Sequence, residues 1–191
     1  MRKIILASKS PRRKALLKNI GLKFAVEVSD VKEKIDVNIN PRKIAENLSL
    51  EKARKIAIKH RNALIIAADT FVVYKNKIIG KPKTEKNARK MLKLLSGEQH
   101  LVITGFTIID TKSGKTVTKS DETKVYLKKM TRDEIDAYIK TKEPLDKAGA
   151  YAAQEKGGLF VEKIEGDFLN VVGLPIFKLT SELKKFNVKI L

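Results

Sequence analysis

Apolar and polar residues along this chain alternate in blocks that predict strands and helices in turn. A short apolar run at residues 3–6 precedes Ser10-Pro11, and an amphipathic segment follows from Lys14 to Ile20. A serine hydroxyl suits the N-cap of a helix, and proline suits the first helical position. The pattern therefore predicts a strand, a tight loop and a helix that ends at Gly21.

Longer elements repeat this order in the middle of the chain. The segment from Pro41 to His60 has apolar residues at helical spacing, which predicts a long amphipathic helix. The continuous apolar run at residues 63–68 predicts a strand buried on both faces, and it ends at Asp69-Thr70. We therefore expect the Asp69 carboxylate to emerge at the carboxyl edge of a sheet, where α/β proteins bind ligands.

The second half of the chain mixes a hairpin with helices and irregular segments. Thr84 caps a helix through Leu95, and Thr131 with Glu134 forms a capping box that opens another. The remaining expectations are a hairpin (101–109 with 116–127), loops (142–154 and 166–173), a strand (159–164) and a last helix (174–186). Together the blocks predict an α/β protein with a mixed sheet and two lobes.

Length and cysteine content narrow the class of protein. The chain has 191 residues, enough for one domain or two small lobes, and it has no cysteine. This excludes a disulfide framework, a thiolate metal site and a cysteine nucleophile. No apolar run approaches the length of a signal peptide core or a membrane span, so we expect a soluble cytoplasmic protein.

The charge balance is unusual and raises nucleic acid as a partner. The chain carries 41 Lys and Arg against 22 Asp and Glu, a net charge of +19. The lysines are spread over nearly every segment and mixed with acids, and aromatic residues make up only 6%. Because few aromatic rings are present for bases to stack on, we interpret most of the charge as solvated surface, with no specific nucleic acid partner. A basic nucleic-acid-binding protein without catalysis stays open as an alternative.

The loop and helix start at residues 8–13 form the first candidate site. Ser8 and Ser10 supply hydroxyl donors, the helix start supplies backbone N–H groups, and Arg12 and Arg13 supply two guanidinium groups. Cationic residues in the first turn oppose the helix dipole, so these arginines favour a function beyond folding. The segment predicts a phosphate site.

Five further residues are candidates that have equally ordinary alternatives. Asp69 suits a metal ligand or general base, or a strand-end acid that bonds turn N–H groups. Glu33 suits a second ligand to a hard cation, and the amide of Gln154 matches the N–H and carbonyl edge of uracil or thymine. Lys81 between Gly80 and Pro82, and Lys52 on the long helix, suit phosphate binding or plain solvation.

Common nucleotide and hydrolase motifs are absent from the chain. Gly114-Lys115-Thr116 resembles the end of a Walker A loop, but Ile109 stands where the first glycine is required. The sequence contains no G-x-S-x-G, H-E-x-x-H or G-x-G-x-x-G pattern. The usual hydrolase, zinc-protease and dinucleotide-binding interpretations are therefore excluded.

Six blocks of the sequence together resemble one known family. The chain is similar, along nearly its whole length, to the Maf-like nucleoside triphosphate pyrophosphatases through Ser8-Lys9-Ser10-Pro11-Arg12-Arg13, Glu51-Lys52-Ala53, Ala68-Asp69-Thr70, Gly80-Lys81-Pro82, residues 143–151 and residues 170–175. The block that ends at Gln154 resembles the branch acting on dTTP and UTP. The order of the blocks makes this resemblance far more specific than any single motif.

The resemblance implies an activity and a setting. It implies hydrolysis of a nucleoside triphosphate between the α and β phosphates, a house-cleaning role in nucleotide pools, and a divalent cation, Mg²⁺ or Mn²⁺. It also implies that residues 1–191 form a single domain of the Maf/ITPase-like α/β type, with a twisted mixed sheet, flanking helices and two lobes around a deep cleft. The resemblance further implies a homodimer, as is common in the family. A nucleotide-sensing protein without turnover is a further alternative.

The resemblance also implies roles for individual residues. Asp69 matches the proton acceptor, and Arg12, Thr70 and Gln154 match positions linked to base specificity. Phosphate and metal positions of the family match the following residues: Ser8, Arg13, Glu33, Lys52 and Lys81. Asp69 and Glu33 are the expected metal ligands.

Overall fold

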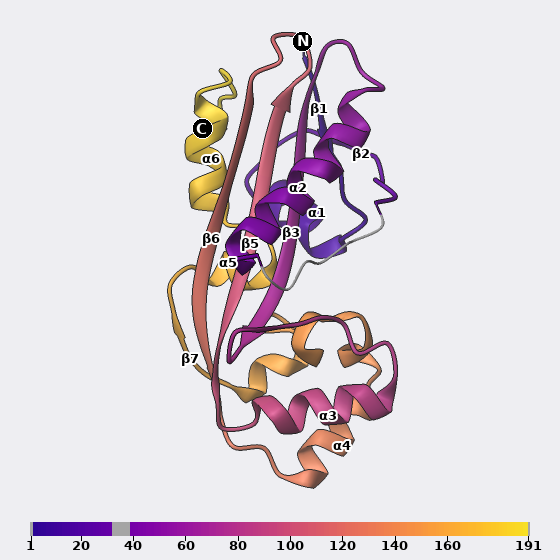
Figure 1. The fold of residues 1–191 in the computed structure, drawn as a ribbon, viewed down its shortest axis with the longest axis vertical. Helices are drawn as coiled ribbons and strands as arrows, with labels where there is room; N and C mark the ends of the chain where they lie inside the picture. Colours follow the sequence, from indigo (N-terminus) through magenta and orange to yellow (C-terminus); the bar gives the residue numbers. More distant parts are fainter. Residues whose placement is uncertain (1, 32–38, 191) are drawn as a thin grey trace. The chain divides into compact units, whose positions relative to one another are not determined.

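The structure is a computed structural model that describes residues 2–31 and 39–190 (Figure 1). Within these residues it contains one seven-stranded mixed sheet in the order β2-β1-β3-β5-β6-β7, with β4 paired to β3. The strands are β1 (Lys3–Leu6), β2 (Ala25–Val26), β3 (Ala63–Tyr74), β4 (Lys77–Ile79), β5 (Gln99–Asp110), β6 (Thr116–Leu127) and β7 (Val161–Glu165). The predicted α/β class with a mixed sheet is therefore confirmed.

The N-terminal strand, loop and helix form as the sequence predicts. Helix α1 (Pro11–Asn19) begins at the proline, and its N-cap Ser10 accepts a hydrogen bond from the Arg13 N–H at 3.4 Å. Gly21 follows the helix with a φ of 74°, a conformation that glycine adopts without a steric penalty. Strand β2 follows this turn and is only two residues long.

Helix α2 (Pro41–Ala57) covers one face of the parallel part of the sheet. Strand β1 pairs in parallel with both β2 and β3. Ala53 and Ile56 of α2 pack against Ile5 of β1 and against Ile65 of β3, and all four side chains are fully buried. Because burial of large aliphatic side chains stabilises a fold by about 1.5–3 kcal/mol each, this contact fixes α2 on the sheet.

Strand β3 is longer than predicted, and this corrects the expected place of Asp69. The sequence suggested a strand that ends at Ala68, but the structure has one strand that continues through Asp69 to Tyr74. The last pair between β1 and β3 joins Leu6 to Ile66, whereas β5 runs beside β3 on its other side and β4 pairs with residues 72–74. Asp69 therefore lies inside β3, beyond the carboxyl end of its parallel neighbour β1.

The second half of the chain contains the predicted helices and four short elements that were not predicted, three 3₁₀ turns and one helix. Helix α3 (Glu85–Leu95) follows its cap Thr84, and α4 (Arg132–Lys140) opens with the predicted capping box. The segment expected as a loop at 142–154 includes the 3₁₀ turns η1 (Glu143–Asp146) and η2 (Ala148–Ala150), and η3 (Lys156–Phe160) precedes β7. The loop expected at 166–173 contains the short helix α5 (Phe168–Val172), and α6 (Ile176–Lys184) closes the chain.

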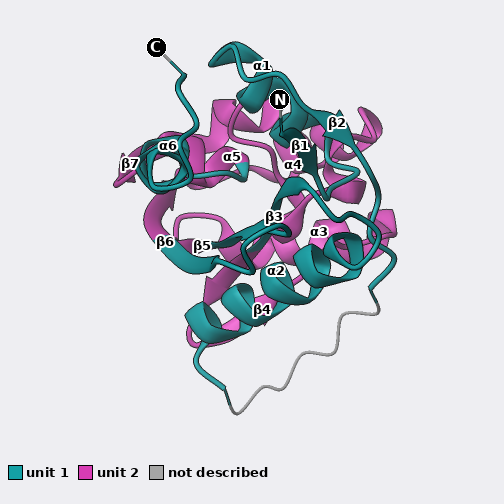
Figure 2. Ribbon diagram, turned by 90° about the horizontal axis from the view of Figure 1, so that it is seen from above, with its two compact units in different colours: residues 1–70, 104–121, 173–191 teal, residues 71–103, 122–172 magenta. Residues whose placement is uncertain are grey.

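The chain divides into two compact units (Figure 2). Unit 1 comprises residues 1–70, 104–121 and 173–191, and unit 2 comprises residues 71–103 and 122–172. Each unit has a hydrophobic cluster of its own, one between α2 and the first strands and one around α3, α4 and the 3₁₀ turns. The interpretation of residues 1–191 as one domain with a deep cleft stays a prediction.

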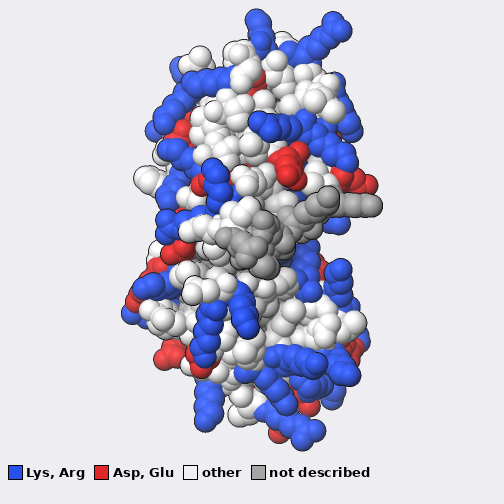
Figure 3. Space-filling model, in the orientation of Figure 1, with Lys and Arg blue, Asp and Glu red and all other residues white. Residues whose placement is uncertain are grey.

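The face of the molecule drawn in Figure 3 carries basic residues in many places rather than in one patch. Lys and Arg side chains are scattered over it, with Asp and Glu among them. Over residues 2–31 and 39–190, no helix is long and apolar enough to cross a membrane.

Candidate active site

Strand β3 directs two neighbouring candidate residues to opposite faces of the sheet. Successive side chains of a strand alternate between its faces, so Asp69 shares the α2 face with Ile65 and Ala67. Thr70 points to the other face. Asp69 is 6% exposed, which is unusual for an acid and calls for a partner.

The partner of Asp69 is Lys52, from the middle of α2. The Lys52 ammonium donates a hydrogen bond to Asp69 Oδ1, and both side chains are largely buried. Lys52 is followed directly by the buried residue Ala53, so the core contact of α2 places its amine over β3. From the sequence, Lys52 and Asp69 were two separate candidates. In the structure they form one buried ion pair with no net charge.

On the other face, the Arg13 guanidinium is held by three different segments of unit 1. Its Nε donates to the Gly173 carbonyl at 2.9 Å, and Nη2 donates to Thr70 Oγ1 at 2.9 Å. Nη1 donates to Ser8 Oγ at 3.3 Å. The planar fork of arginine suits such a fixed geometry, which the flexible amine of lysine does not provide. Arg13 is thus oriented by the chain before any ligand binds.

The two serines of the first loop have different local tasks. Ser8 is buried, and its Oγ accepts hydrogen bonds from the Ser10 N–H at 3.2 Å and from Arg13. In both of these bonds the Ser8 hydroxyl acts as an acceptor through the lone pairs of its oxygen. Ser10 caps α1, so its predicted phosphate role competes with a structural one. Arg12 lies half-buried on α1.

Thr104 of β5 contacts the candidate residue Thr70, and the sequence does not mark it. Its Oγ1 lies 2.9 Å from Thr70 Oγ1, and the residue is completely buried. The hydroxyl group thus supports Thr70 from the neighbouring strand. A threonine in an apolar strand carries no signal of this kind, because its partner depends on the register of β3 and β5.

Unit 2 contains two further predicted site residues, Lys81 and Gln154. Lys81 is exposed in a loop that is bonded to the irregular segment: the Gly149 N–H donates to the Gly80 carbonyl at 3.1 Å, and the Lys83 N–H donates to the Leu145 carbonyl at 3.3 Å. Two of the sequence blocks therefore lie together within unit 2. Gln154 is exposed and comes from the segment that follows the second of these blocks.

A buried polar pair anchors the start of the segment that carries Gln154. His100 Nε2 and the Tyr151 hydroxyl lie 2.8 Å apart, and both side chains are at most 5% exposed. Burial lowers the pKa of His100 to about 4, and burial raises the pKa of Tyr151. Both groups are therefore neutral near neutral pH, so the pair is a structural anchor and does not supply charge.

The predicted metal ligands are only partly within the described residues. Glu33 lies outside the residues that the structure describes, and among the described residues no group of three or more His, Cys, Asp or Glu side chains forms a metal site. Mg²⁺ is commonly held by one or two carboxylates together with substrate phosphates and water. The Asp69 carboxylate fits that donor chemistry.

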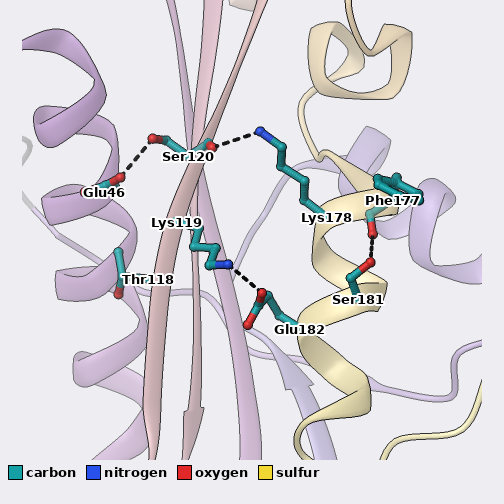
Figure 4. A pocket seen from close by; sticks show the side chains of 8 residues that line it. All are labelled: Glu46, Thr118, Lys119, Ser120, Phe177, Lys178, Ser181 and Glu182. Carbon is teal, nitrogen blue, oxygen red and sulfur yellow. Dashed lines mark hydrogen bonds and ion pairs between the residues drawn. The ribbon is translucent and has the colours of Figure 1, made fainter.

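A pocket of about 430 Å³ lies elsewhere in unit 1, between α2, β6 and α6 (Figure 4). None of the predicted site residues lines it. Its polar side chains bond one another: Lys119 donates to the buried Glu182 at 2.7 Å, and Ser120 donates to Glu46 at 2.8 Å. These bonds join both helices to β6, which indicates a structural role.

Comparisons with known proteins find similarity along nearly the whole chain. The family model described as Maf-like protein matches residues 3–186. A dTTP/UTP pyrophosphatase of Methanosarcina barkeri is 51% identical over 191 residues, covering 100% of this chain and 97% of that protein. Proteins of the same name from Alkaliphilus metalliredigens and Bacillus cereus are 52% and 50% identical, again over 100% of this chain and over 100% and 98% of their own lengths.

Proposed function

We propose that this chain, which belongs to the Maf-like protein family, hydrolyses dTTP and UTP to the monophosphate and pyrophosphate. The observation that carries the proposal is the identity of about half the residues, over the full chain, with relatives named dTTP/UTP pyrophosphatase. The buried Lys52–Asp69 pair and the oriented Arg13 support it, because both supply groups that triphosphate chemistry uses.

Charge neutralisation is the first task of such an enzyme. A triphosphate carries about four negative charges near neutral pH, and its cleavage depends mostly on positioning and on neutralising that charge. We assign phosphate contacts to the Ser8 hydroxyl, Arg13, Lys52 and Lys81, and to the helix start capped by Ser10. The three bonds that fix Arg13 favour this role, because a preoriented fork loses little freedom when it binds an anion.

Proton transfer is assigned to Asp69. As water attacks the α-phosphorus, its proton passes to the Asp69 carboxylate, and the bond from the α-phosphorus to the bridging oxygen breaks so that pyrophosphate leaves. Lys52 offsets the charge of the carboxylate when the site is empty. When phosphates bind, the same ammonium is available to them as a neighbouring cation.

A divalent cation, Mg²⁺ or Mn²⁺, belongs to this proposal. Asp69 and Glu33 would hold it through carboxylate oxygens, the ligands that hard cations prefer. Its chemical contribution when bound is to neutralise charge on the phosphates.

Base selection is assigned to Arg12, Thr70 and Gln154. The Gln154 amide both donates and accepts, which matches the N–H and carbonyl edge of uracil and thymine. Cytosine presents an acceptor and an amino group on that edge, so the same amide orientation does not fit it. We propose further that the protein works in the cytoplasm as a homodimer that removes unwanted nucleotides.

The proposal is tested by measuring pyrophosphate release over a panel of nucleoside triphosphates with Mg²⁺ or Mn²⁺. We expect release from dTTP, UTP and modified pyrimidine triphosphates. Tight binding without release would favour a nucleotide sensor. If no nucleoside triphosphate of the panel gives pyrophosphate, and the protein binds DNA with an affinity that falls steeply with salt concentration, a basic nucleic-acid-binding protein would be favoured.

A further inference from the structure

The carboxylate of Glu143 accepts hydrogen bonds from the backbone that follows Gln154 in the sequence. Its Oε1 accepts hydrogen bonds from the Tyr138 hydroxyl at 2.7 Å and from the Gly157 N–H at 3.0 Å. Its Oε2 accepts a hydrogen bond from the Lys156 N–H at 3.2 Å. An ionised carboxylate has only acceptors, and here three donors from two segments converge on it. Glu143 therefore joins the end of α4 to the chain just after Gln154.

The hydroxyl of Tyr138 extends this connection to the chain just before Gln154. The Ala152 N–H donates to Tyr138 Oη at 3.2 Å, while Oη donates to Glu143. Tyr138 is 4% exposed, and burial, followed by the bond to Glu143, raises its pKa. The hydroxyl thus stays protonated and keeps both bonds. Two residues before Gln154 and two residues after it, the backbone is bonded to one Tyr–Glu pair.

Gly157 makes this close approach sterically possible. A Cβ added to Gly157 would lie 2.5 Å from Tyr138 Oη and 2.7 Å from the Ala152 nitrogen. These distances are far below normal van der Waals contact. Any side chain at position 157 would therefore push this part of the backbone away from Tyr138 and Ala152. The requirement for glycine here comes from packing against the Tyr–Glu pair.

We propose that Tyr138 and Glu143 are positioning residues that fix the amide of Gln154 for base selection, and thereby set the preference for uracil and thymine. This inference rests on the proposed function, because Gln154 acts there as the base contact. The amide of Gln154 is exposed, so its own side chain does not fix the loop. The backbone bonds on either side of it supply that order.

The test compares Glu143→Gln and Tyr138→Phe with the unaltered protein, using the ratio of kcat/KM for dTTP to that for CTP. We expect this ratio to fall on the order of tenfold, within the hundredfold that a displacement of about 1 Å can cost, and the change to fall mainly on KM. In a Gln154→Ala background the same substitutions should no longer change the ratio, because the group they position is gone.

Matched controls use a second Tyr–Glu bond in unit 2. The Tyr126 hydroxyl donates to Glu165 Oε2 at 3.1 Å between the paired strands β6 and β7, and this bond does not involve residues 152–157. Tyr126→Phe and Glu165→Gln should therefore leave the ratio within about twofold. Thermal melting identifies variants that fold. If Tyr138→Phe does not fold, Glu143→Gln decides the question.

Three outcomes would overturn the inference while the proposed function stands. The first is a folded Glu143→Gln protein with an unchanged dTTP to CTP ratio. The second is an equal fall of the ratio in the Gln154→Ala background, and the third is an equal fall in the Tyr126→Phe control. A lack of pyrophosphate release by the unaltered protein would instead contradict the proposed function itself.

Discussion

The candidate residues of unit 1 and those of unit 2 are held in different ways. In unit 1, Lys52 lies in helix α2, Asp69 lies in strand β3, and Arg13 lies in the first turn of α1. In unit 2, Gln154 lies in an irregular segment whose backbone N–H groups donate hydrogen bonds to the side chains of Tyr138 and Glu143. Because of this difference, we expect substitutions near the unit 1 residues to change mainly the rate of hydrolysis. Substitutions near Gln154 in unit 2 should instead change the preference between bases or the stability of the fold.

The largest expected effect is on the rate, through Asp69→Asn. We expect pyrophosphate release from dTTP to fall on the order of a hundredfold or more, as it does when a general base is removed. Asp121→Asn is a matched control, because Asp121 also pairs with a lysine in unit 1, Lys178, at 2.6 Å. Near-normal turnover of dTTP by Asp69→Asn, measured as kcat, would contradict the role assigned to this residue.

The next effect concerns the fork of Arg13. Arg13→Lys keeps the charge but loses the planar geometry that reaches Gly173, Thr70 and Ser8 together. We expect kcat/KM for dTTP to fall between about tenfold and about a hundredfold. Arg54→Lys, on the exposed face of α2, serves as the control. An equal activity of the two variants would show that charge alone is needed at Arg13.

The third effect is on the free energy of unfolding, which should depend on pH through His100 in unit 2. The pKa of His100 is lowered from 6.5 to about 4 in the folded protein, so between these values the unfolded chain binds more protons. Stability is therefore fully present above about pH 6.5 and is lost as the pH falls toward 4, by about 2 kcal/mol between pH 7 and pH 5.

Denaturant unfolding at both pH values measures the contribution of His100. His100→Gln removes the titrating group, so its loss of stability between pH 7 and pH 5 should be smaller by that amount. His60→Gln provides a control, because His60 is a half-buried histidine in unit 1 that bonds Glu27 at 3.0 Å. An identical pH dependence in the protein with and without His100 would contradict the assignment.

The smallest effect tests the support that Thr104 gives to Thr70. Thr104→Val keeps the shape but removes the hydroxyl group, at a cost of about 1 kcal/mol, or about fivefold in kcat/KM. Thr107→Val is a matched control, because Thr107 is equally buried in β5 and bonds Ser49 and Thr118 instead. Both variants should lose similar stability, but only Thr104→Val should lose activity. An equal loss of activity in both would remove the special role of Thr104.

Much of unit 1 could be predicted from the sequence because local rules determine it. The cap Ser10, the proline after it and the apolar spacing of α2 each act over a few residues, and they fixed the start of α1 and the course of α2. The extent of β3 could not be predicted, because its continuation past Ala68 depends on pairing with β5 and β4. For the same reason the sequence placed Asp69 at a strand end.

The site of unit 2 shows a different limit. The resemblance marked Gln154 as a base contact, but nothing local showed how its segment is held. The bonds of Glu143 to residues 156 and 157 and of Tyr138 to Ala152 join groups that are distant along the chain. Side-chain to backbone bonds of this kind have no periodicity, so only the folded structure reveals them.

The position of water attack tests the central claim most directly. The protein is allowed to hydrolyse dTTP in water enriched in oxygen-18, and the products are identified by phosphorus NMR and mass spectrometry. We predict dTMP and pyrophosphate, with the labelled oxygen in dTMP, because water attacks the α-phosphorus. Label in the pyrophosphate, or formation of dTDP and phosphate, would contradict the account.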